Sequence, residues 1–241
     1  MESLKRGVTQ LTKLRHPQIL IVQHPLEESR ESLAFATEPV FASLANILGN
    51  GENMPSAPVV QFKNYKLFDV EIKYGLLQVA EGLAFLHNDV KLLHHNICPE
   101  TIIVNHQGAW KIFGFDFCVH NDRNDGQPFW PITEYSQFVP HVAQPNLDYF
   151  APEHILTNTQ STASDMFSLG MLIYAIYNDG NPVNKYNDDL NFYKKKVTEL
   201  KNLQSKPLIN IPEGLRELEK MMLHTTPELR PDAHQFTKVI N

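Results

Sequence analysis

Two adjacent histidines, His94 and His95, and the nearby Cys98 have the side-chain types best suited to catalysis or metal binding. A metal site needs further ligands at helical or strand spacing, and the histidine pair does not supply them. A Ser-His-Asp or Cys-His arrangement could be assembled from the residues present, but no nucleophile elbow or oriented spacing supports one. We therefore expect His94 to have a structural role.

Cysteine content and net charge argue against further classes of site and of binding partner. Cys98 and Cys118 are the two cysteines of the 241-residue chain, and neither belongs to a CxxC pair, so no disulfide framework or zinc site is predicted. The formal net charge of -6 argues against a general nucleic-acid binder. The lysine run 194–196 is interpreted as a solvated helix face.

Apolar segments give no sign of membrane insertion. The longest strongly apolar run, 169–177, is too short for a span of about 20 residues. The first ten residues lack the apolar region of a secretory signal. We expect a protein without a transmembrane segment that is cytoplasmic or peripheral to a membrane.

Hydrophobic periodicity predicts the elements that would position these residues. Leu4, Val8, Leu11 and Leu14 have helical spacing, and Pro17 ends that helix. Apolar runs at 19–23 and 33–37, separated by charged residues, predict a hairpin or neighbouring strands.

The middle of the chain predicts a long helix and a second pair of strands. Asp69 is expected to cap a helix that runs to about residue 88. Strands are predicted at 102–105 and 110–113 with a turn over 105–108. The proline-rich stretch 115–152 is predicted to be a long functional loop.

Helices dominate the last third of the chain. The segment 164–178 is apolar almost all round, which indicates a central buried helix. Amphipathic helices are predicted at 188–203, 212–224 and 232–240.

Short motifs along the chain resemble those of a protein kinase, in the same order. They are HHNICPET at 94–101, GFD at 114–116, YFAPE at 149–153, SDMFSLG at 164–170 and RP at 230–231. They match the catalytic loop, the metal-binding turn, the end of the activation segment, the F helix and a late arginine. Each match is weak alone, but their order and spacing are a strong signal.

The resemblance implies a protein-kinase-like α+β fold. A partial N-lobe of C helix and two strands would occupy 1–40, and a complete helical C-lobe would occupy 41–241. The closer resemblance is to the Scy-like pseudokinase family, in the branch associated with clathrin-coated vesicles. It rests on LKRGVTQLTKLRHP, HPLEESRESLAFATEPVFASLANILGN and GAWKIFGFDFCV.

By this resemblance, the catalytic positions are degenerate. Asn96 stands where kinases carry the carboxylate that accepts the substrate proton, and an amide cannot act as that base. Cys98 replaces the lysine that faces the transferred phosphate. Thr101 and Gly114 replace the two metal-binding residues. Asp116 is either a displaced metal ligand or, as we favour, an ordinary loop carboxylate.

The nucleotide cleft is also incomplete. Gly7 falls on the C-helix glutamate position, and the chain contains no GxGxxG and no VAIK-like lysine, so we expect an N-terminally truncated kinase-like domain. Thr37 matches the gatekeeper, and Glu38 and Val40 match hinge positions that could contact adenine. We favour a plain strand-to-helix connection there, expect no cofactor, and consider ATP binding improbable.

Other matching residues have structural roles by the resemblance. Glu153 and Arg230 would form the ion pair that anchors the activation segment. Asp165 would receive backbone N–H groups of the catalytic loop, and His94 would pack below that loop. The stretch 128–131 is either a docking surface or packed on its own lobe.

The sequence thus predicts a catalytically inactive interaction module or scaffold. The resemblance implies a role in clathrin-dependent trafficking at Golgi, endosomal or coated-vesicle membranes. Its partners would be clathrin coat or adaptor machinery bound through regions outside this chain, and nucleic acid is not expected. The competing hypothesis is a weak ATP-dependent serine/threonine kinase with degenerate motifs.

Overall fold

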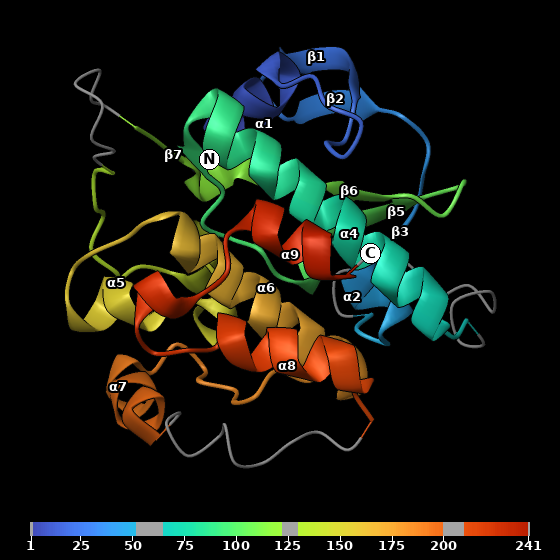
Figure 1. The fold of residues 1–241 in the computed structure, drawn as a ribbon. Helices are drawn as coiled ribbons and strands as arrows, with labels where there is room; N and C mark the ends of the chain where they lie inside the picture. The colour runs from blue at the N-terminus through green and yellow to red at the C-terminus, as the bar shows by residue number, and fades with distance from the viewer. Residues whose placement is uncertain (1, 52–64, 122–129, 200–209, 241) are drawn as a thin grey trace.

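A computed structural model describes residues 2–51, 65–121, 130–199 and 210–240 (Figure 1). Helix α1 and the hairpin β1–β2 lie at one end of the molecule, and the larger helical part surrounds α6. Helices and strands together give the α+β class predicted from the sequence. No helix in the described ranges is long and apolar enough to cross a membrane.

Helix α1 (Glu2–Lys13) forms where the apolar spacing predicts it. Val8 and Leu11 are buried, whereas Leu4 is half exposed. The helix ends three residues before His16, whose ring stacks on Phe85 at 4.5 Å between centroids.

The hairpin pairs β1 (Val22–Glu28) with β2 (Leu33–Thr37) in antiparallel register. The strand predicted at 19–23 is therefore misplaced. Ile19 and Leu20 are buried beside β6, because Leu20 N–H donates to Ile112 O at 3.1 Å and Ile112 N–H donates to Gln18 O at 2.8 Å. The observed strand is mostly exposed, so its polar residues gave no apolar signal.

A three-stranded sheet with the order β3–β5–β6 lies beside the long helix α4. Its strands are β3 (Val40–Ser43), β5 (Ile102–Asn105) and β6 (Trp110–Ile112). Gly108 closes the predicted turn with a φ of 78°, and Asn105 Oδ1 accepts the N–H groups of Gln107 and Ala109. Strand β3 leads directly into the short helix α2 (Leu44–Ile47).

Helix α4 (Asp69–Phe85) begins one residue earlier than the predicted cap implies. Phe68 is the N-cap residue, and the Glu71 carboxylate accepts its N–H at 2.8 Å. Gly75 allows the Trp110 ring to approach the helix, since a Cβ there would collide with the indole. A π-helical turn, η1 (Leu86–Val90), continues α4 and leads into β4 (Leu92–Leu93).

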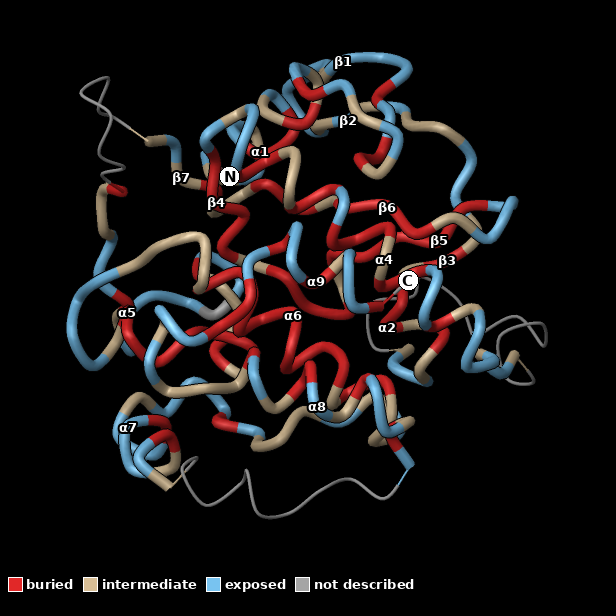
Figure 2. The backbone as a smooth tube through the Cα atoms, in the orientation of Figure 1, coloured by how far each residue is buried: buried red, intermediate tan, exposed pale blue. Residues whose placement is uncertain are grey.

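Helix α6 (Thr162–Tyr177) is the buried centre of the helical part, as predicted (Figure 2). Around it lie α5 (Pro152–Leu156), α7 (Leu190–Glu199), α8 (Glu213–Met222) and α9 (Ala233–Ile240). The stretch 115–152 contains short elements: η3 (Phe115–Phe117), β7 (Val119–His120), η4 (His141–Ala143) and η5 (Leu147–Tyr149).

Glu219 on α8 is a buried carboxyl whose pKa burial raises to about 7, against the smaller opposing effects of Lys220 and Arg216. A raised carboxyl pKa means that folding stability falls as pH rises from about 4.5 to about 7. We expect Glu219→Gln to be more stable than the parent by roughly 2–3 kcal/mol at pH 8, with a smaller difference at pH 5.

Urea unfolding at the two pH values tests this expectation. Glu213→Gln, which changes an exposed carboxylate on the same helix, is the control and should show no comparable pH dependence. An equal effect of Glu219→Gln at pH 5 and pH 8 would contradict it.

Candidate functional site

Asp165 on α6 holds the segment that follows β4. Its Oδ2 accepts the His94 N–H at 2.8 Å and contacts His87 Nε2 at 2.8 Å, and its Oδ1 accepts the His95 N–H at 2.8 Å. The carboxylate is fully buried, and its hydrogen bonds, led by the one to His87, overcome the effect of burial and hold its pKa below the usual value. The structure thus places Asp165 where it orders residues 94–96.

The His94 side chain lies beneath this segment and is completely buried. Its Nε2 lies 2.9 Å from Phe113 O, its Nδ1 accepts the Asn96 N–H at 3.3 Å, and its ring meets Phe115 edge-on at 4.8 Å. Burial lowers the pKa of His94. These contacts occupy both ring nitrogens, so His94 connects the 94–96 turn to the end of β6.

Asn96, at the position of the missing base, faces the segment before α5. Its side-chain Oδ1 accepts the Asn146 N–H at 3.1 Å, and its backbone O accepts the Thr101 hydroxyl at 2.7 Å. The amide oxygen of Asn96 thus accepts a backbone hydrogen bond, and an amide cannot act as the carboxylate base that a kinase uses.

Cys98 and Thr101 lie together behind Asn96, and both are buried. The Thr101 hydroxyl accepts the Cys98 N–H at 3.2 Å, and burial raises the pKa of the Cys98 thiol well above its usual value. A protonated, buried thiol is neither a phosphate-facing cation nor a nucleophile.

Gly114 has a φ of 77°, in the left-handed region that disfavours residues with a Cβ. A Cβ at this position would lie 2.6 Å from Thr101 Cγ2. The methyl group of Thr101 therefore fills the space that the first side-chain carbon of an aspartate would need. Thr101 and Gly114, the two expected metal positions, therefore pack against each other.

Asp116 packs against Gly7 of α1. A Cβ at Gly7 would collide with its Oδ1, while Arg6 donates to its backbone O at 2.7 Å. Burial raises the pKa of Asp116. No group of three or more His, Cys, Asp or Glu residues in the described ranges could hold a metal ion. Whether Asp116 is a displaced metal ligand or a loop carboxylate stays a prediction.

The hinge positions carry hydrogen bonds of their own. Glu38 Oε1 accepts the Ile21 N–H at 3.0 Å and lies 3.3 Å from Lys111 Nζ, and the Glu38 backbone O accepts the Thr37 hydroxyl at 2.9 Å. Val40 opens strand β3 opposite Asn105. Adenine would have to share the Glu38 carbonyl with Thr37.

Glu153 and Arg230 form a buried bidentate ion pair between α5 and the turn before α9. Arg230 donates to the two Glu153 carboxylate oxygens at 2.8 and 2.9 Å. Arg230 also donates to His224 O and Ala163 O, and the Ser164 hydroxyl donates to Glu153. The network connects α5 and α6 to the segment between α8 and α9.

Two weaker surface predictions are resolved in part. Trp130 is buried, which favours packing of this residue on its own lobe, whereas residues 128 and 129 lie outside the described ranges. Lys194 and Lys195 are exposed on α7, and Lys196 Nζ pairs with Glu199 at 2.7 Å. A solvated helix face describes this run.

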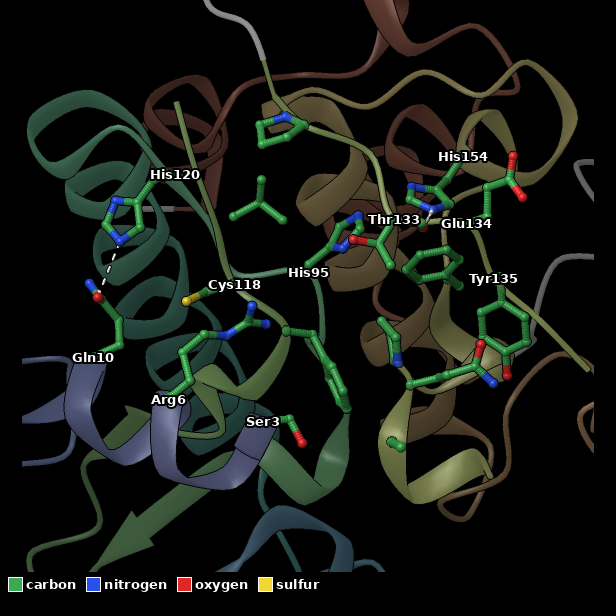
Figure 3. Close-up of a pocket in the computed structure, with 17 residues that line it drawn as sticks. Ser3, Arg6, Gln10, His95, Cys118, His120, Thr133, Glu134, Tyr135 and His154 are labelled. Atoms are coloured by element: carbon green, nitrogen blue, oxygen red, sulfur yellow. Dashed lines mark hydrogen bonds between the residues drawn. The ribbon is translucent and has the colours of Figure 1, made fainter. Parts of the chain in front are cut away.

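Two features of the site were missed from the sequence. His87 reaches Asp165 from the π-helical turn η1, and apolar periodicity does not reveal such a turn. A cavity of about 450 Å³ also lies between α1 and the segment 131–154 (Figure 3). It combines residues far apart in the chain, so no local pattern could have located it.

Comparison with known proteins matches residues 2–239 to the protein kinase domain family. The chain is 54% identical to SCY1-like protein 2 of Homo sapiens over 99% of its length, and 30% identical to protein kinase-like protein SCY1 of Saccharomyces cerevisiae over 89%. It is 29% identical over 74% to a Dictyostelium discoideum protein named probable inactive serine/threonine-protein kinase scy1. The chain spans 26%, 27% and 19% of these relatives.

Proposed function

Because this chain belongs to the protein kinase family, in its Scy-like group, we propose that it is a catalytically inactive kinase-like domain that acts as a scaffold or interaction module. One observation carries the proposal. Gly114 has no side chain, and Thr101 directs its hydroxyl to Asn96 O and its methyl group toward Gly114, so neither expected metal position presents a carboxylate or amide oxygen to magnesium.

Two further observations support loss of phosphoryl transfer. The side-chain oxygen of Asn96 accepts a hydrogen bond from the Asn146 N–H, and Asp116 occupies the space beside Gly7 where a C-helix glutamate would lie. Phosphoryl transfer depends on positioned charge around the phosphates. At positions 96, 101 and 114, uncharged residues stand where kinases carry groups that manage that charge.

The competing function is a weak ATP-dependent serine/threonine kinase, and membership of the kinase family supports it. A thermal-shift titration with ATP and Mg²⁺ or Mn²⁺ separates the two. We expect no metal-dependent rise in melting temperature up to millimolar ATP, because the hinge carbonyl is shared with Thr37 and metal ligands are absent from the degenerate positions. A saturable, metal-dependent rise would favour the competing function.

We also propose that the native protein serves clathrin-dependent trafficking at Golgi, endosomal or coated-vesicle membranes. The support is resemblance to the Scy-like branch and the 54% identity to SCY1-like protein 2. Its partners would be coat or adaptor subunits, bound through regions outside these 241 residues.

Proximity labelling with the whole native protein tests this role in cells. Clathrin coat or adaptor subunits are expected among the labelled proteins. The isolated 241-residue chain is expected not to retain purified clathrin on an affinity column. Labelling confined to unrelated compartments would contradict the trafficking proposal while leaving the argument about catalysis intact.

A further inference from the structure

The cavity between α1 and the segment 131–154 has the size of a small-molecule site, at about 450 Å³. Ser3, Arg6 and Gln10 of α1 form one wall, and His95 and His154 lie across from them (Figure 3). Apolar surface comes from Phe117, Val119, Pro131, Pro145 and Phe150. The lining thus combines an apolar body with a few polar groups.

His95 lines this cavity and carries a buried ring nitrogen that has no hydrogen-bond partner among the described residues. The residue is only 8% exposed, and the nitrogen is its Nε2. Buried polar atoms are nearly always paired, so an orphan of this kind indicates a missing water or ligand. Burial also lowers the pKa of His95 to about 4, which keeps the imidazole neutral at physiological pH.

The backbone holds the His95 ring in place. Its φ of 68° is unusual for a residue other than glycine, and the N–H bond to Asp165 maintains it. The ring lies 5.0 Å from both Phe150 and His154, between ring centroids. Both ring nitrogens of the neighbouring His154 have partners, because they contact Thr133 O at 2.8 Å and Gln160 Oε1 at 3.0 Å.

Arg6 supplies the positive charge of the cavity. One N–H donates to Asp116 O, which leaves further donors of its five for a ligand, and Figure 3 shows the guanidinium directed into the space between α1 and His95. Glu134 is exposed at the opposite rim and points away from Arg6. A single guanidinium beside a neutral imidazole suits one negative charge better than two.

We propose that this cavity binds a small amphipathic carboxylate. The carboxylate pairs with the Arg6 guanidinium, the apolar body lies against Phe117 and Phe150, and a polar group on the ligand bonds to His95 Nε2. This binding needs neither ATP nor a metal, so it is independent of whether the domain transfers phosphate.

The test is a titration of the ¹⁵N-labelled chain with 3-(4-hydroxyphenyl)propionate, followed by NMR, including the His95 ring nitrogens. We expect saturable binding and a shift of His95 Nε2. The neutral amide of the same probe should bind about tenfold more weakly than the carboxylate, because a hydrogen bond to a charged group contributes roughly 1.5 kcal/mol or more. 3-Phenylpropionate, which lacks the hydroxyl, should bind without shifting His95 Nε2.

Arg6→Gln should weaken binding of the carboxylate about tenfold and remove its advantage over the amide. Arg15→Gln, an exposed arginine just beyond the same helix, is the matched control and should bind as the parent does. Val119→Trp, which fills the cavity, should abolish binding.

Three results would overturn the proposal. The first is absence of binding at 10 mM probe, which would leave water as the partner of His95. The second is binding that Arg6→Gln does not change. The third is tighter binding of phenyl phosphate than of the carboxylate, which would make the cavity a site for a dianion.

Discussion

Replacement of Arg230 by methionine is expected to lower the free energy of unfolding by about 3–5 kcal/mol, the usual cost of removing one partner from a buried ion pair. The side chains of Arg230 and Glu153 are 0% and 4% exposed, so the remaining carboxylate would stay buried without its cation. His224 O and Ala163 O would lose their donor as well. Urea unfolding followed by circular dichroism measures the loss.

Two comparisons make that result specific. Arg15→Met changes an exposed arginine and should cost little. The double variant Glu153→Met/Arg230→Met removes both charges and should recover part of the stability lost by Arg230→Met alone. A loss below about 1 kcal/mol for Arg230→Met would show that the pair does not anchor the segment before α5.

Gly114→Asp, which introduces the kinase residue at the expected metal position, is expected to destabilise the domain by about 2–5 kcal/mol. The left-handed backbone contributes about 1–2 kcal/mol once a Cβ is present. Overpacking against Thr101 Cγ2 contributes about 1–3 kcal/mol more. Combining it with Asn96→Asp should still yield no phosphotransfer.

The chain offers a close control for the backbone part of this effect. Gly108 has a φ of 78°, nearly equal to that of Gly114, but a Cβ there would meet nothing within 4 Å. Gly108→Asp should therefore show only the backbone cost. Thr101→Ser, which removes Cγ2 and keeps the hydroxyl bonds, should relieve Gly114→Asp. Equal losses for Gly108→Asp and Gly114→Asp would refute the steric argument.

The replaced catalytic positions are coupled rather than independent. Thr101 fills the space beside Gly114, and Asp116 fills the space beside Gly7. Reintroducing either kinase residue alone therefore meets a neighbour that has taken its place. We therefore expect phosphotransfer only from a variant that is changed on both sides of each contact and also carries a carboxylate at position 96.

Local patterns were sufficient for much of the fold. The central helix α6, the turn at Gly108 and the strands β5 and β6 lie where apolar periodicity and turn residues predict them. The kinase-like fold, which rested on motif order, agrees with the family match over residues 2–239. These features follow from short segments or from motifs whose order is strongly constrained.

Features that depend on tertiary contacts were not predictable in this way. The first hairpin is formed by polar, exposed residues, so β1 was placed too early, on the apolar run that instead packs beside β6. Asp69 was expected to be the N-cap residue of α4, but Phe68 is, and the Glu71 carboxylate accepts the Phe68 N–H. His87 reaches Asp165 through a π-helical turn, and the cavity beside His95 is lined by four segments that are separate in the chain.

The roles of the retained and replaced residues converge on one claim, that this kinase-like domain does not transfer phosphate. The most direct measurement is transfer of radiolabelled γ-phosphate from ATP, with Mg²⁺ or Mn²⁺, to general substrates and to the chain itself. We predict incorporation no greater than in the absence of protein. Metal-dependent turnover that Asn96→Ala abolishes would contradict the claim.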